Sequence, residues 1–436
     1  MYKLVILLAL MKRLGVVGLG YVGLPLALLA SQKGFNVVGV DTNKEKIDKL
    51  LSKKSPFNDK HIGQELGKTQ CTFTTDFSLL SKCKYFFVCV PTPVKENKEP
   101  DLSLLEDALK EIAPYITHNS EVIVESTINP GVCDELVIPE LEKMTSLKVN
   151  GDFGVSHCPE RINPGDEKWN LSNIPRVIGS SNPKSIEKVT AIYKKIIESD
   201  ITKMSSLKEA EAVKIIENSF RDINIAFVNE LSKSFHKMSI NLDNVIKGAS
   251  TKPFAFMPHY PGCGVGGHCI PVDPYYLIQR GSQFGFDHNF LKLAREINES
   301  MPSYTVDLLK EAANEVNIDL KDSSVLILGQ SYKADVSDMR ESPAVHLFSL
   351  LQQENLKVHR FEPFDKRYSD FSSLEQALRA CKLVIVATGH DDFRKLSSKD
   401  FVEYGTKIIV DGRGIFGSIY KDIQSSGIVY RGIGIN

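Results

Sequence analysis

A glycine pattern near the N-terminus restricts the fold more than any other part of the sequence. In VVGLGYVGLPLA the glycines follow the spacing Gly18-x-Gly20-x-x-Gly23, after an apolar run and before a helical pattern. Between a strand and a helix, this spacing is typical of the turn in a dinucleotide-binding βαβ unit. The first glycine permits the tight turn, the second lets the backbone approach a pyrophosphate, and the third lets the helix pack closely on the strand. We therefore expect a parallel sheet at the N-terminus.

The rest of the first half repeats the alternation that such a sheet requires. Short runs rich in β-branched residues alternate with helical patterns such as LPLALLASQKG and LSLLEDALKEIAPYI. The runs are LGVVGLG, NVVGVD, YFFVCV, EVIVES and FGVSH. They are apolar at consecutive positions, as strands buried on both faces are. This alternation predicts a doubly wound α/β domain.

The sequence then changes to a long helical pattern and back to strands. From Leu207 a helical periodicity continues without Gly or Pro through KEAEAVKIIENSFRDINIAFVNELSKSFHKM. After Leu320 the apolar runs SSVLILG, KVHRFEP, KLVIVATG and TKIIVDGRG return. The predicted fold is α/β, with two Rossmann-like domains joined by a long central helix and a helical domain. We place the boundaries at an N-terminal extension 1–10, a first α/β domain 11–204, a helical domain 205–305 and a second α/β domain 306–436.

Bulk properties exclude several classes of partner. The formal net charge is −1, so neither a nucleic-acid binder nor a membrane binder is expected. The leading MYKLVILLAL is too short to span a bilayer and has no small-residue cleavage site, so we take Met11 as the natural start of the fold, with a weak membrane-associating leader as the alternative for residues 1–10. The eight cysteines are scattered, and several lie in apolar runs, which favours a reducing cytoplasm over a disulfide framework.

The central helix also predicts an oligomer. Ile, Phe, Val and Leu recur along its whole length. Such a helix has more apolar surface than one flanking domain covers, so we expect at least a homodimer, formed along residues 207–238.

An acidic residue completes the predicted cofactor site. The strand NVVGVD ends at Asp41, eighteen residues after Gly23. A carboxylate there hydrogen-bonds the ribose hydroxyls of the cofactor and repels a 2′-phosphate, so we expect NAD rather than NADP. Tyr21 and Val22, between the glycines, belong to the same site. In VPTPV the prolines end a strand at the edge where ligands bind, and Thr92 is a candidate contact there, with a simple turn as the alternative.

The segment YPGCGVGGHCIPVDPYY places two cysteines in one glycine-rich loop. Its glycines remove side-chain bulk, so the backbone can press against a ligand. Cys263, His268 and Cys269 could bind zinc, although their spacing is not the usual paired C-x₂-C and a fourth ligand is not obvious. Both thiols could instead fill space in the interior. The third alternative, beside an NAD site, is covalent catalysis in which a thiolate attacks a carbonyl group.

The loop GVGGHCIPVDPYYL resembles the active-site segment of the nucleotide-sugar 6-dehydrogenases, which include UDP-glucose, GDP-mannose and UDP-N-acetylhexosamine dehydrogenases. The resemblance covers the chain from Met11, in the order cofactor domain, long helix, cysteine loop and UDP-binding domain. GGHC followed by PVDPYY is similar to the UDP-N-acetylhexosamine branch. The resemblance implies that Cys269 is the nucleophile, with Asp273 beside it and Gly266 at the substrate, and that Cys263 has no chemical role.

The resemblance further implies a four-electron oxidation that uses two NAD⁺. The 6-hydroxyl of the sugar becomes an aldehyde, Cys269 adds to it to form a thiohemiacetal, a second hydride transfer forms a thioester, and water releases the uronate. A thiolate suits these steps because it is nucleophilic near neutral pH once its pKa falls. UDP-N-acetylglucosamine is the best candidate substrate, with UDP-N-acetylmannosamine or UDP-glucose as alternatives.

Further positions match motifs of this family. Lys214 and Asn218 in AEAVKIIENSF lie on one helix face and resemble residues that stabilise charge on the reacting oxygens. Thr127 in ESTINPG resembles the threonine that positions the catalytic water, and it also borders the cofactor site. Glu160 in CPERINPG resembles the general base of thioester hydrolysis, and Arg161 beside it is a candidate substrate contact. A helix cap or an ion pair is the alternative for each acid.

The C-terminal half contributes cations that match ligand contacts of the family. In GQSYKADVSDMRESPA, Lys333 is implied to reach the UDP-sugar and Arg340 the NAD phosphates. Arg413 in IVDGRGIF matches a substrate-binding arginine, whose planar group suits a pyrophosphate. Arg295 in KLAREINESMP is a candidate for the substrate pocket, with a surface salt bridge as the alternative.

Two other functions fit part of the sequence. A single-step NAD dehydrogenase of the 3-hydroxyacid or 6-phosphogluconate type also pairs a Rossmann domain with a helical domain. It needs neither a cysteine nucleophile nor a second α/β domain. An NAD-sensing regulator would keep the fold but lose the chemical residues, which are all present here.

Overall fold

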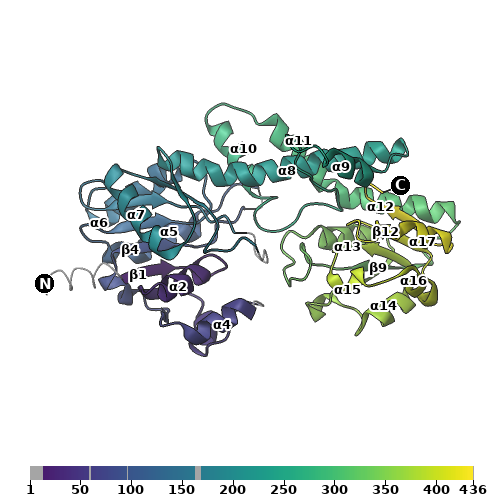
Figure 1. Ribbon diagram of the computed structural model, residues 1–436, viewed down its shortest axis with the longest axis horizontal. Coiled ribbons are helices and arrows are strands. Elements are labelled where there is room, and N and C mark those ends of the chain that lie inside the picture. Colours follow the sequence, from purple (N-terminus) through teal and green to yellow (C-terminus); the bar gives the residue numbers. More distant parts are fainter. Residues whose placement is uncertain (1–12, 58–59, 96, 163–167, 436) are drawn as a thin grey trace. The chain divides into compact units, whose positions relative to one another are not determined.

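The computed structural model describes residues 13–57, 60–95, 97–162 and 168–435, and it divides into two compact units (Figure 1). The N-terminal unit contains the chain up to Glu217 together with Tyr275–Phe286. The C-terminal unit contains Asn218–Pro274 and Asp287–Asn436. The predicted extension 1–10 and Met11 lie outside the described residues.

The N-terminal unit is built on an eight-stranded sheet with the order β3-β2-β1-β4-β5-β6-β7-β8. The strands are β1 (Arg13–Val17), β2 (Asn36–Val40), β3 (Thr72–Thr74), β4 (Tyr85–Val88), β5 (Glu121–Val124), β6 (Gly154–His157), β7 (Arg176–Ser180) and β8 (Ile201–Lys203). Neighbouring strands are parallel, except that β7 is antiparallel to β6. The five expected strands are confirmed. The sequence reading missed β3, β7 and β8, of which β3 and β8 have only three residues.

Helices pack on both faces of this sheet because its central strands are apolar on both sides. They are α2 (Gly23–Gln32), α3 (Lys44–Leu51), α4 (Lys60–Lys68), α5 (Ser103–Ile112), α6 (Ile138–Thr145) and α7 (Pro183–Ile196). Side chains of α2 and α7 share one core cluster with Leu14 and Ile178, and those of α5 and α6 share another with Val17 and Val124. Strand order reverses between β1 and β4, so the carboxyl ends of these strands form the edge where such sheets bind ligands.

The helical region begins with α8 (Leu207–Lys237), which confirms the long helix expected from the sequence. It has 31 residues, with Glu209 in its first turn and Lys237 in its last, charges that complement the helix dipole. The N-terminal unit includes α8 up to Glu217, and the C-terminal unit includes the rest. The helices that follow are α9 (Leu242–Ala249), α10 (Asp273–Gln283), α11 (Asn289–Glu299) and α12 (Met301–Glu315).

The C-terminal unit contains a parallel five-stranded sheet with the order β10-β9-β11-β12-β13. Its strands are β9 (Ser324–Leu328), β10 (Lys357–Phe361), β11 (Leu383–Val386), β12 (Ile408–Asp411) and β13 (Val429–Gly432). Its helices are α13 (Pro343–Gln353), α14 (Leu374–Ala380), α15 (Asp391–Arg394), α16 (Ser398–Tyr404) and α17 (Tyr420–Ser425). One core cluster contains α12 and α13 and another contains α14, α16 and α17. The predicted fold class, with two Rossmann-like domains, is confirmed.

Within the described ranges, no helix is both long and apolar enough to cross a bilayer.

Candidate active site

The predicted cofactor turn joins β1 to α2 at the carboxyl edge of the N-terminal sheet. Gly18 has a φ of +89°, which side chains other than glycine rarely adopt, and its N–H donates to the Val40 carbonyl oxygen at 2.8 Å. A Cβ on Gly23 would overlap the carbonyl oxygen of Gly18, whereas a Cβ on Gly20 would meet no atom within 4 Å. The protein's own packing therefore requires the first and third glycines, and Gly20 leaves the face of the turn open.

The N-terminus of α2 has the features of an anion site. Val22 at its N-cap makes no capping hydrogen bond through its side chain, and the first turn contains no acidic residue. The N–H groups of a first helical turn have no partners within the helix and attract negative charge. Together with Gly20, this turn fits the pyrophosphate of NAD. Tyr21 is exposed beside it, and its ring stacks on Phe57 with the centroids 4.2 Å apart.

Asp41 lies directly beside the glycine turn, as predicted. Its Oδ2 accepts a hydrogen bond from the Leu19 N–H at 2.9 Å and forms an ion pair with Lys46 Nζ at 2.5 Å. Its Oδ1 accepts a hydrogen bond from the Asn43 N–H at 2.9 Å. A carboxylate oxygen can accept two hydrogen bonds, so Oδ1 can also accept one from a ribose hydroxyl. Lys46, which partly offsets the charge of Asp41, was not among the residues predicted from the sequence.

The carboxylate of Asp41 is expected to make the protein prefer NAD⁺ over NADP⁺. Even with Lys46 beside it, the carboxylate disfavours a 2′-phosphate, so NADP⁺ should bind at least about tenfold more weakly, which corresponds to roughly 1.4 kcal/mol. The Asp41→Asn variant should narrow this difference. Calorimetric titration of the protein with both nucleotides measures it without any substrate. Equal affinities of the wild type for the two nucleotides would show that Asp41 does not select the cofactor.

The loops after β4 and β5 are tied together at the same sheet edge. Thr92 is buried, and its Oγ1 donates to the Thr127 carbonyl oxygen at 2.5 Å. The hydroxyl of Tyr276, in α10, donates to the Thr92 carbonyl oxygen. Asn129 Nδ2 in turn donates to the Tyr276 carbonyl oxygen at 3.2 Å. Helix α10, which begins four residues after Cys269, is thus anchored to the loops beside the cofactor turn.

Glu160 and Arg161 follow the next strand, β6. Glu160 is 7% exposed, and its Oε1 accepts hydrogen bonds from the N–H groups of Arg161 at 2.6 Å and Ile162 at 2.7 Å. Its Oε2 pairs with Arg176 at 2.7 Å. The side chain of Arg161 pairs with Glu217 of α8 at 2.5 Å. The ion pair considered as the alternative for Glu160 is therefore present, and its catalytic role stays a prediction.

Two predicted residues of α8 lie one turn apart. Lys214 is half-buried in the N-terminal unit. Asn218 is buried in the C-terminal unit, and its Nδ2 donates to Asp273 Oδ2 at 2.5 Å. Asp273 is the first residue of α10, where the helix dipole favours a carboxylate. The structure therefore brings Asn218 and Asp273 together.

The two cysteines of the glycine-rich loop have opposite surroundings. All eight cysteines lie in the described part of the chain, and Cys269 alone is exposed. The Cys269 carbonyl oxygen accepts hydrogen bonds from the N–H groups of Val272 at 3.1 Å and Asp273 at 2.9 Å, which fixes its backbone at the start of α10. Cys263 is fully buried in the core against the C-terminal sheet, with Sγ 3.4 Å from the Ala387 carbonyl oxygen. Across the described residues, no three side chains that bind metals come together.

The glycine-rich loop is held against the C-terminal domain at two points. Near its middle, the Gly267 N–H donates to the Arg340 carbonyl oxygen at 3.2 Å, and neighbouring Gly266 has no room for a Cβ because backbone and side-chain atoms lie within 3 Å of that position. Near its start, the Cys263 N–H donates to the Gly412 carbonyl oxygen at 3.0 Å. Both points lie beside the segments that contain the predicted ligand contacts Arg340 and Arg413.

The cations predicted to bind ligands in the C-terminal unit lie in the loops that follow strands β9 and β12. Lys333 is half-buried in the loop after β9. The exposed side chain of Arg340 pairs with Asp338 at 2.6 Å. Arg413 follows β12, and its Nε donates to the Ala387 carbonyl oxygen at 2.8 Å. Their contacts with a UDP-sugar or with NAD stay predictions.

Arg295 differs from the surface salt bridge that we considered as its alternative, because it is buried. Its Nη1 pairs with Asp222 Oδ1 at 2.6 Å. Asn298 Nδ2 donates to the same oxygen at 2.8 Å, and Asn298 Oδ1 accepts a hydrogen bond from Asn229 Nδ2, also at 2.8 Å. Asn229 Oδ1 then accepts one from the Gly262 N–H at 2.9 Å. This buried network connects α8 and α11 with the cysteine loop.

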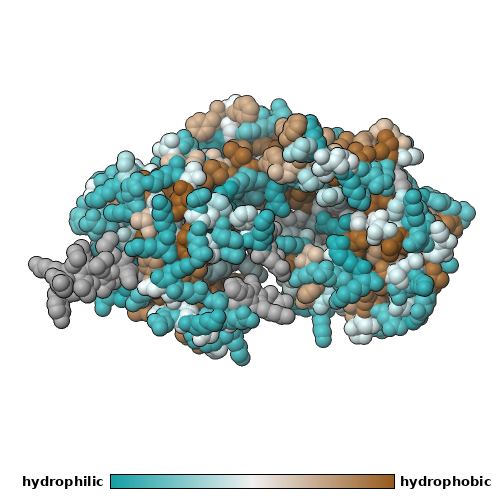
Figure 2. Space-filling model, viewed as in Figure 1, coloured by the Kyte–Doolittle hydropathy of each residue, from teal (hydrophilic) through white to brown (hydrophobic). Residues whose placement is uncertain are grey.

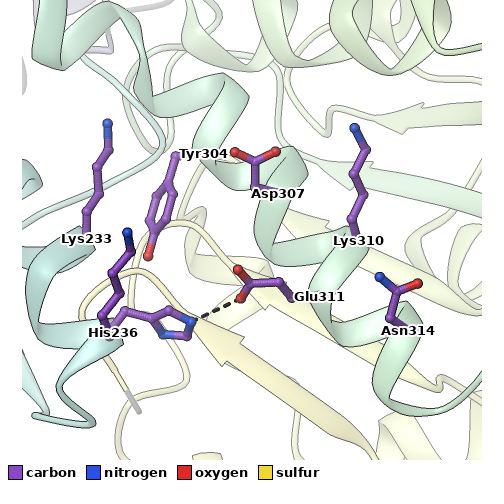
Figure 3. Close-up of a pocket in the computed structure, with 8 residues that line it drawn as sticks. Lys233, His236, Tyr304, Asp307, Lys310, Glu311 and Asn314 are labelled. Atoms are coloured by element: carbon purple, nitrogen blue, oxygen red, sulfur yellow. Dashed lines mark hydrogen bonds and ion pairs between the residues drawn. The ribbon is translucent and has the colours of Figure 1, made fainter.

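A separate open cavity of about 500 Å³ lies between α8 and α12 in the C-terminal unit (Figure 3). It is lined by Lys233, His236, Lys237, Tyr304, Asp307, Lys310, Glu311 and Asn314. Figure 3 shows His236 and Glu311 pointing toward each other, with a separation of 3.1 Å between His236 Nε2 and Glu311 Oε2. None of the predicted site residues lines this cavity.

The predicted catalytic residues divide between the two units. The N-terminal unit holds Thr127, Glu160 and Lys214, and the C-terminal unit holds Asn218, Cys269 and Asp273. Within the units, the structure joins Asn218 to Asp273, and the Thr92 hydroxyl to the backbone of Thr127. A meeting of Cys269 with Lys214 and Glu160 stays a prediction.

Sequence reasoning missed two buried residues beside this site, Arg176 and Tyr276. Arg176 opens the segment RVIGS, and a charge that is buried at the start of an apolar strand requires a partner. That requirement could have marked Arg176 as a site residue, although it does not identify the partner. Tyr276 gave no comparable signal, because an aromatic residue in a helix more often fills a core.

Family models match three consecutive parts of the chain. The match is to the UDP-glucose/GDP-mannose dehydrogenase family, with its NAD binding domain at residues 12–197, its central domain at 208–300 and its UDP binding domain at 326–418.

Individual relatives are similar over nearly their whole length. The chain is 36% identical over 420 residues to a UDP-N-acetyl-D-glucosamine 6-dehydrogenase of Pseudomonas aeruginosa, covering 92% of this chain and 97% of that protein. It is 34% identical over 427 residues to a UDP-N-acetyl-D-mannosamine dehydrogenase of Pyrococcus horikoshii, covering 97% and 99%. A solved structure of a UDP-D-ManNAc dehydrogenase from Pyrococcus horikoshii has a TM-score of 0.89 to this chain at 34% identity, covering 97% of this chain and 99% of that one.

Proposed function

The chain belongs to the UDP-glucose/GDP-mannose dehydrogenase family, and on this premise we propose that it oxidises C6 of a UDP-N-acetylhexosamine to the uronic acid. The family expected from the sequence and its cofactor, NAD, are confirmed. UDP-N-acetylglucosamine is the first candidate substrate. UDP-N-acetylmannosamine is the second, because relatives that act on each sugar are similarly close.

One observation carries this proposal. Cys269 is exposed, whereas Cys263 in the same loop is fully buried, so the loop presents one thiol to a ligand and encloses the other. A single-step dehydrogenase needs no such thiol. The exposed thiol therefore supports the covalent, four-electron reaction.

The proposed reaction proceeds on Cys269 in balanced steps. The substrate alcohol loses a hydride and a proton to become an aldehyde. The Cys269 thiolate adds to the aldehyde carbon, the oxygen takes up a proton, and the thiohemiacetal loses a second hydride and a proton to become a thioester. Water then cleaves the C–S bond, which releases the carboxylate and regenerates the thiol. NAD⁺ supplies the hydride acceptor in each oxidation, so the balance is two NADH per sugar.

The other predicted residues have roles that suit their surroundings. Lys214 and Asn218 stabilise the negative charge that develops on the substrate oxygen. Asp273 accepts a hydrogen bond from the Asn218 side-chain amide at 2.5 Å and so holds that amide in one orientation. Thr127 positions the water, and Glu160 accepts a proton from it.

We also propose the domain boundaries 11–204, 205–305 and 306–436 given by the sequence. A reducing, cytoplasmic location remains our proposal for the protein. The cysteines support it, because most of the eight are buried thiols rather than members of a disulfide framework.

Two NADH are expected for each sugar oxidised. NADH absorbance should be followed to completion with limiting UDP-N-acetylglucosamine, UDP-N-acetylmannosamine, UDP-N-acetylgalactosamine and UDP-glucose in parallel. A response to UDP-glucose alone would overturn the acetamido assignment. One NADH per sugar would instead support the single-step dehydrogenase.

The protein is expected to be at least a homodimer in solution. Large apolar side chains of the C-terminal unit are exposed on and near α8, namely Phe220, Phe227, Phe254, Met257, Phe290 and Leu293. Figure 2 shows brown atoms over α9 and α11, the helices next to this part of α8. An apolar face of this composition usually marks an interface, and a second copy of the chain would cover it.

Light scattering at micromolar concentration tests the oligomer. A charge on this face, in Phe227→Asp, should shift the protein toward a monomer, because burying an unpaired carboxylate opposes association. The matched control Lys399→Glu, on α16, should leave the mass of the wild type unchanged. A monomeric wild type would contradict the expectation.

A further inference from the structure

A buried ion cluster lies at the carboxyl edge of the N-terminal sheet, next to Glu160. Strand β7 runs antiparallel to β6, with His157 paired to Gly179. Its first residue, Arg176, therefore reaches the edge at which the parallel strands β5 and β6 end. Those ends are followed by Glu125 and by Glu160, so two carboxylates meet one guanidinium that is itself fully buried.

The contacts of Arg176 fix both the side chain of Glu160 and the backbone before it. Nη2 lies 2.7 Å from Glu160 Oε2 and 3.5 Å from Glu125 Oε2, and Nη1 donates to the Pro159 carbonyl oxygen at 3.1 Å. Glu160 Oε1 already accepts two hydrogen bonds from backbone N–H groups. The carboxylate is thus held in one rotamer, and only Oε2 has capacity for a further donor such as water.

The groups around Arg176 favour its ion pair with Glu160 over one with Glu125. Burial raises the pKa of Glu125 to about 7, which weakens its claim on the charge of Arg176. The Tyr193 hydroxyl donates to Glu125, and the ring of Tyr193 lies 5.8 Å from the guanidinium carbon. Burial also raises the pKa of Cys158 to about 12 and that of Cys89 well above its usual range, so both thiols are neutral. The carboxylate nearer to Arg176 is that of Glu160, at 2.7 Å against 3.5 Å for Glu125, so Glu160 is its main partner.

We propose that Arg176 is the positioning residue for Glu160 in hydrolysis of the Cys269 thioester, holding the carboxylate in one rotamer with one oxygen aimed at the attacking water. This role rests on the proposed function. In the step itself, water adds to the thioester carbon while Glu160 takes a water proton, and the C–S bond breaks to leave the Cys269 thiolate. Because Arg176 is fully buried, its role in this step is exerted through Glu160.

Variants of Arg176 should slow hydrolysis more than oxidation. With UDP-N-acetylglucosamine or UDP-N-acetylmannosamine, whichever the wild type oxidises, Arg176→Gln should lower the steady-state rate roughly 100-fold. It should still form NADH in the first turnover, and intact-mass spectrometry should find the acyl adduct on Cys269. The acidic limb of its pH profile should move to higher pH, because a carboxylate without its cation keeps a proton more strongly. Arg176→Lys retains the charge and should restore part of the rate and of the profile.

A matched control comes from another ion pair of the same sheet. Lys188 of α7 pairs with Glu121, the first residue of β5, at 2.6 Å and therefore at the opposite end of that strand. Lys188→Gln also removes the cation of a buried carboxylate, so it should lower the melting temperature without accumulating the adduct or moving the pH profile.

The outcomes separate the role of Arg176 from the function itself. If Arg176→Gln does not fold, Arg176→Lys serves as the test. Its effect on the rate of thioester hydrolysis is then measured both in the wild-type protein and in the Glu160→Gln variant. The proposal expects the Arg176→Lys change to slow hydrolysis only where Glu160 is present. Hydrolysis at the wild-type rate, or equal loss of oxidation and hydrolysis, overturns the proposal. A wild type that forms no NADH with any sugar of the panel overturns the proposed function and this role together.

Discussion

Cys269→Ser should abolish the complete oxidation, with a loss of at least about three orders of magnitude in the rate of uronate formation. A serine alkoxide is far harder to form at neutral pH than a thiolate, so neither the hemiacetal adduct nor the ester forms at a useful rate. The variant should keep its affinity for NAD⁺, because Gly18 and Asp41 lie in the N-terminal unit and Cys269 in the other. Mass spectrometry of the products measures the rate of uronate formation, and titration with NAD⁺ measures the affinity for the cofactor.

Cys263→Ser is the matched control, since it makes the same atomic change in the same loop. Cys263 Sγ lies 3.4 Å from the Ala387 carbonyl oxygen, and a serine hydroxyl can donate to that same oxygen. The loss of packing should cost about 1 kcal/mol of stability and leave most of the activity. Iodoacetamide should label Cys269 and inactivate the wild type, and UDP-sugar should protect it. An active Cys269→Ser together with an inactive Cys263→Ser would show that the nucleophile had been assigned to the wrong cysteine.

The second large effect concerns Gly20 and Gly23, which lie three residues apart. Substitution by alanine should impair NAD⁺ binding at one of them and folding at the other. A Cβ on Gly23 overlaps the Gly18 carbonyl oxygen, which is backbone and cannot move aside, so Gly23→Ala should lower the free energy of unfolding by roughly 3 kcal/mol or prevent folding. A Cβ on Gly20 meets no atom within 4 Å, so Gly20→Ala should leave the ligand-free protein as stable as the wild type. It should nevertheless weaken NAD⁺ binding, because the methyl group occupies the face that the pyrophosphate approaches.

Urea unfolding and NAD⁺ titration of both variants test this pair. Gly63→Ala in α4 is the control, because a Cβ there also meets no atom within 4 Å and Gly63 is not one of the glycines of the cofactor turn. It should change neither NAD⁺ affinity nor, beyond a small gain in helix propensity, stability. Unchanged NAD⁺ affinity of Gly20→Ala would place the pyrophosphate elsewhere.

The sequence alone was sufficient for the fold class, the family and the cofactor turn, because each depends on a local pattern. Apolar runs at consecutive positions mark strands buried on both faces, whatever the rest of the chain does. The turn of Gly18 to Gly23 is specified within a single βαβ unit, and Asp41 directly follows the next strand of that unit. The long helix α8 was predictable for the same reason, since its 31 residues keep one periodicity without a breaker.

Only the tertiary structure decided the surroundings of the predicted chemical residues. The two loop cysteines stand six residues apart in one glycine-rich loop, yet the chain buries Cys263 against β11 and β12 and exposes Cys269. Asn218 and Asp273 are 55 residues apart and meet at 2.5 Å. Arg176 reaches Glu160 because β7 runs antiparallel to β6, and strand direction is set by the packing of the whole sheet rather than by the residues of the strand. Contacts between distant segments depend on three-dimensional placement, which a local pattern does not encode.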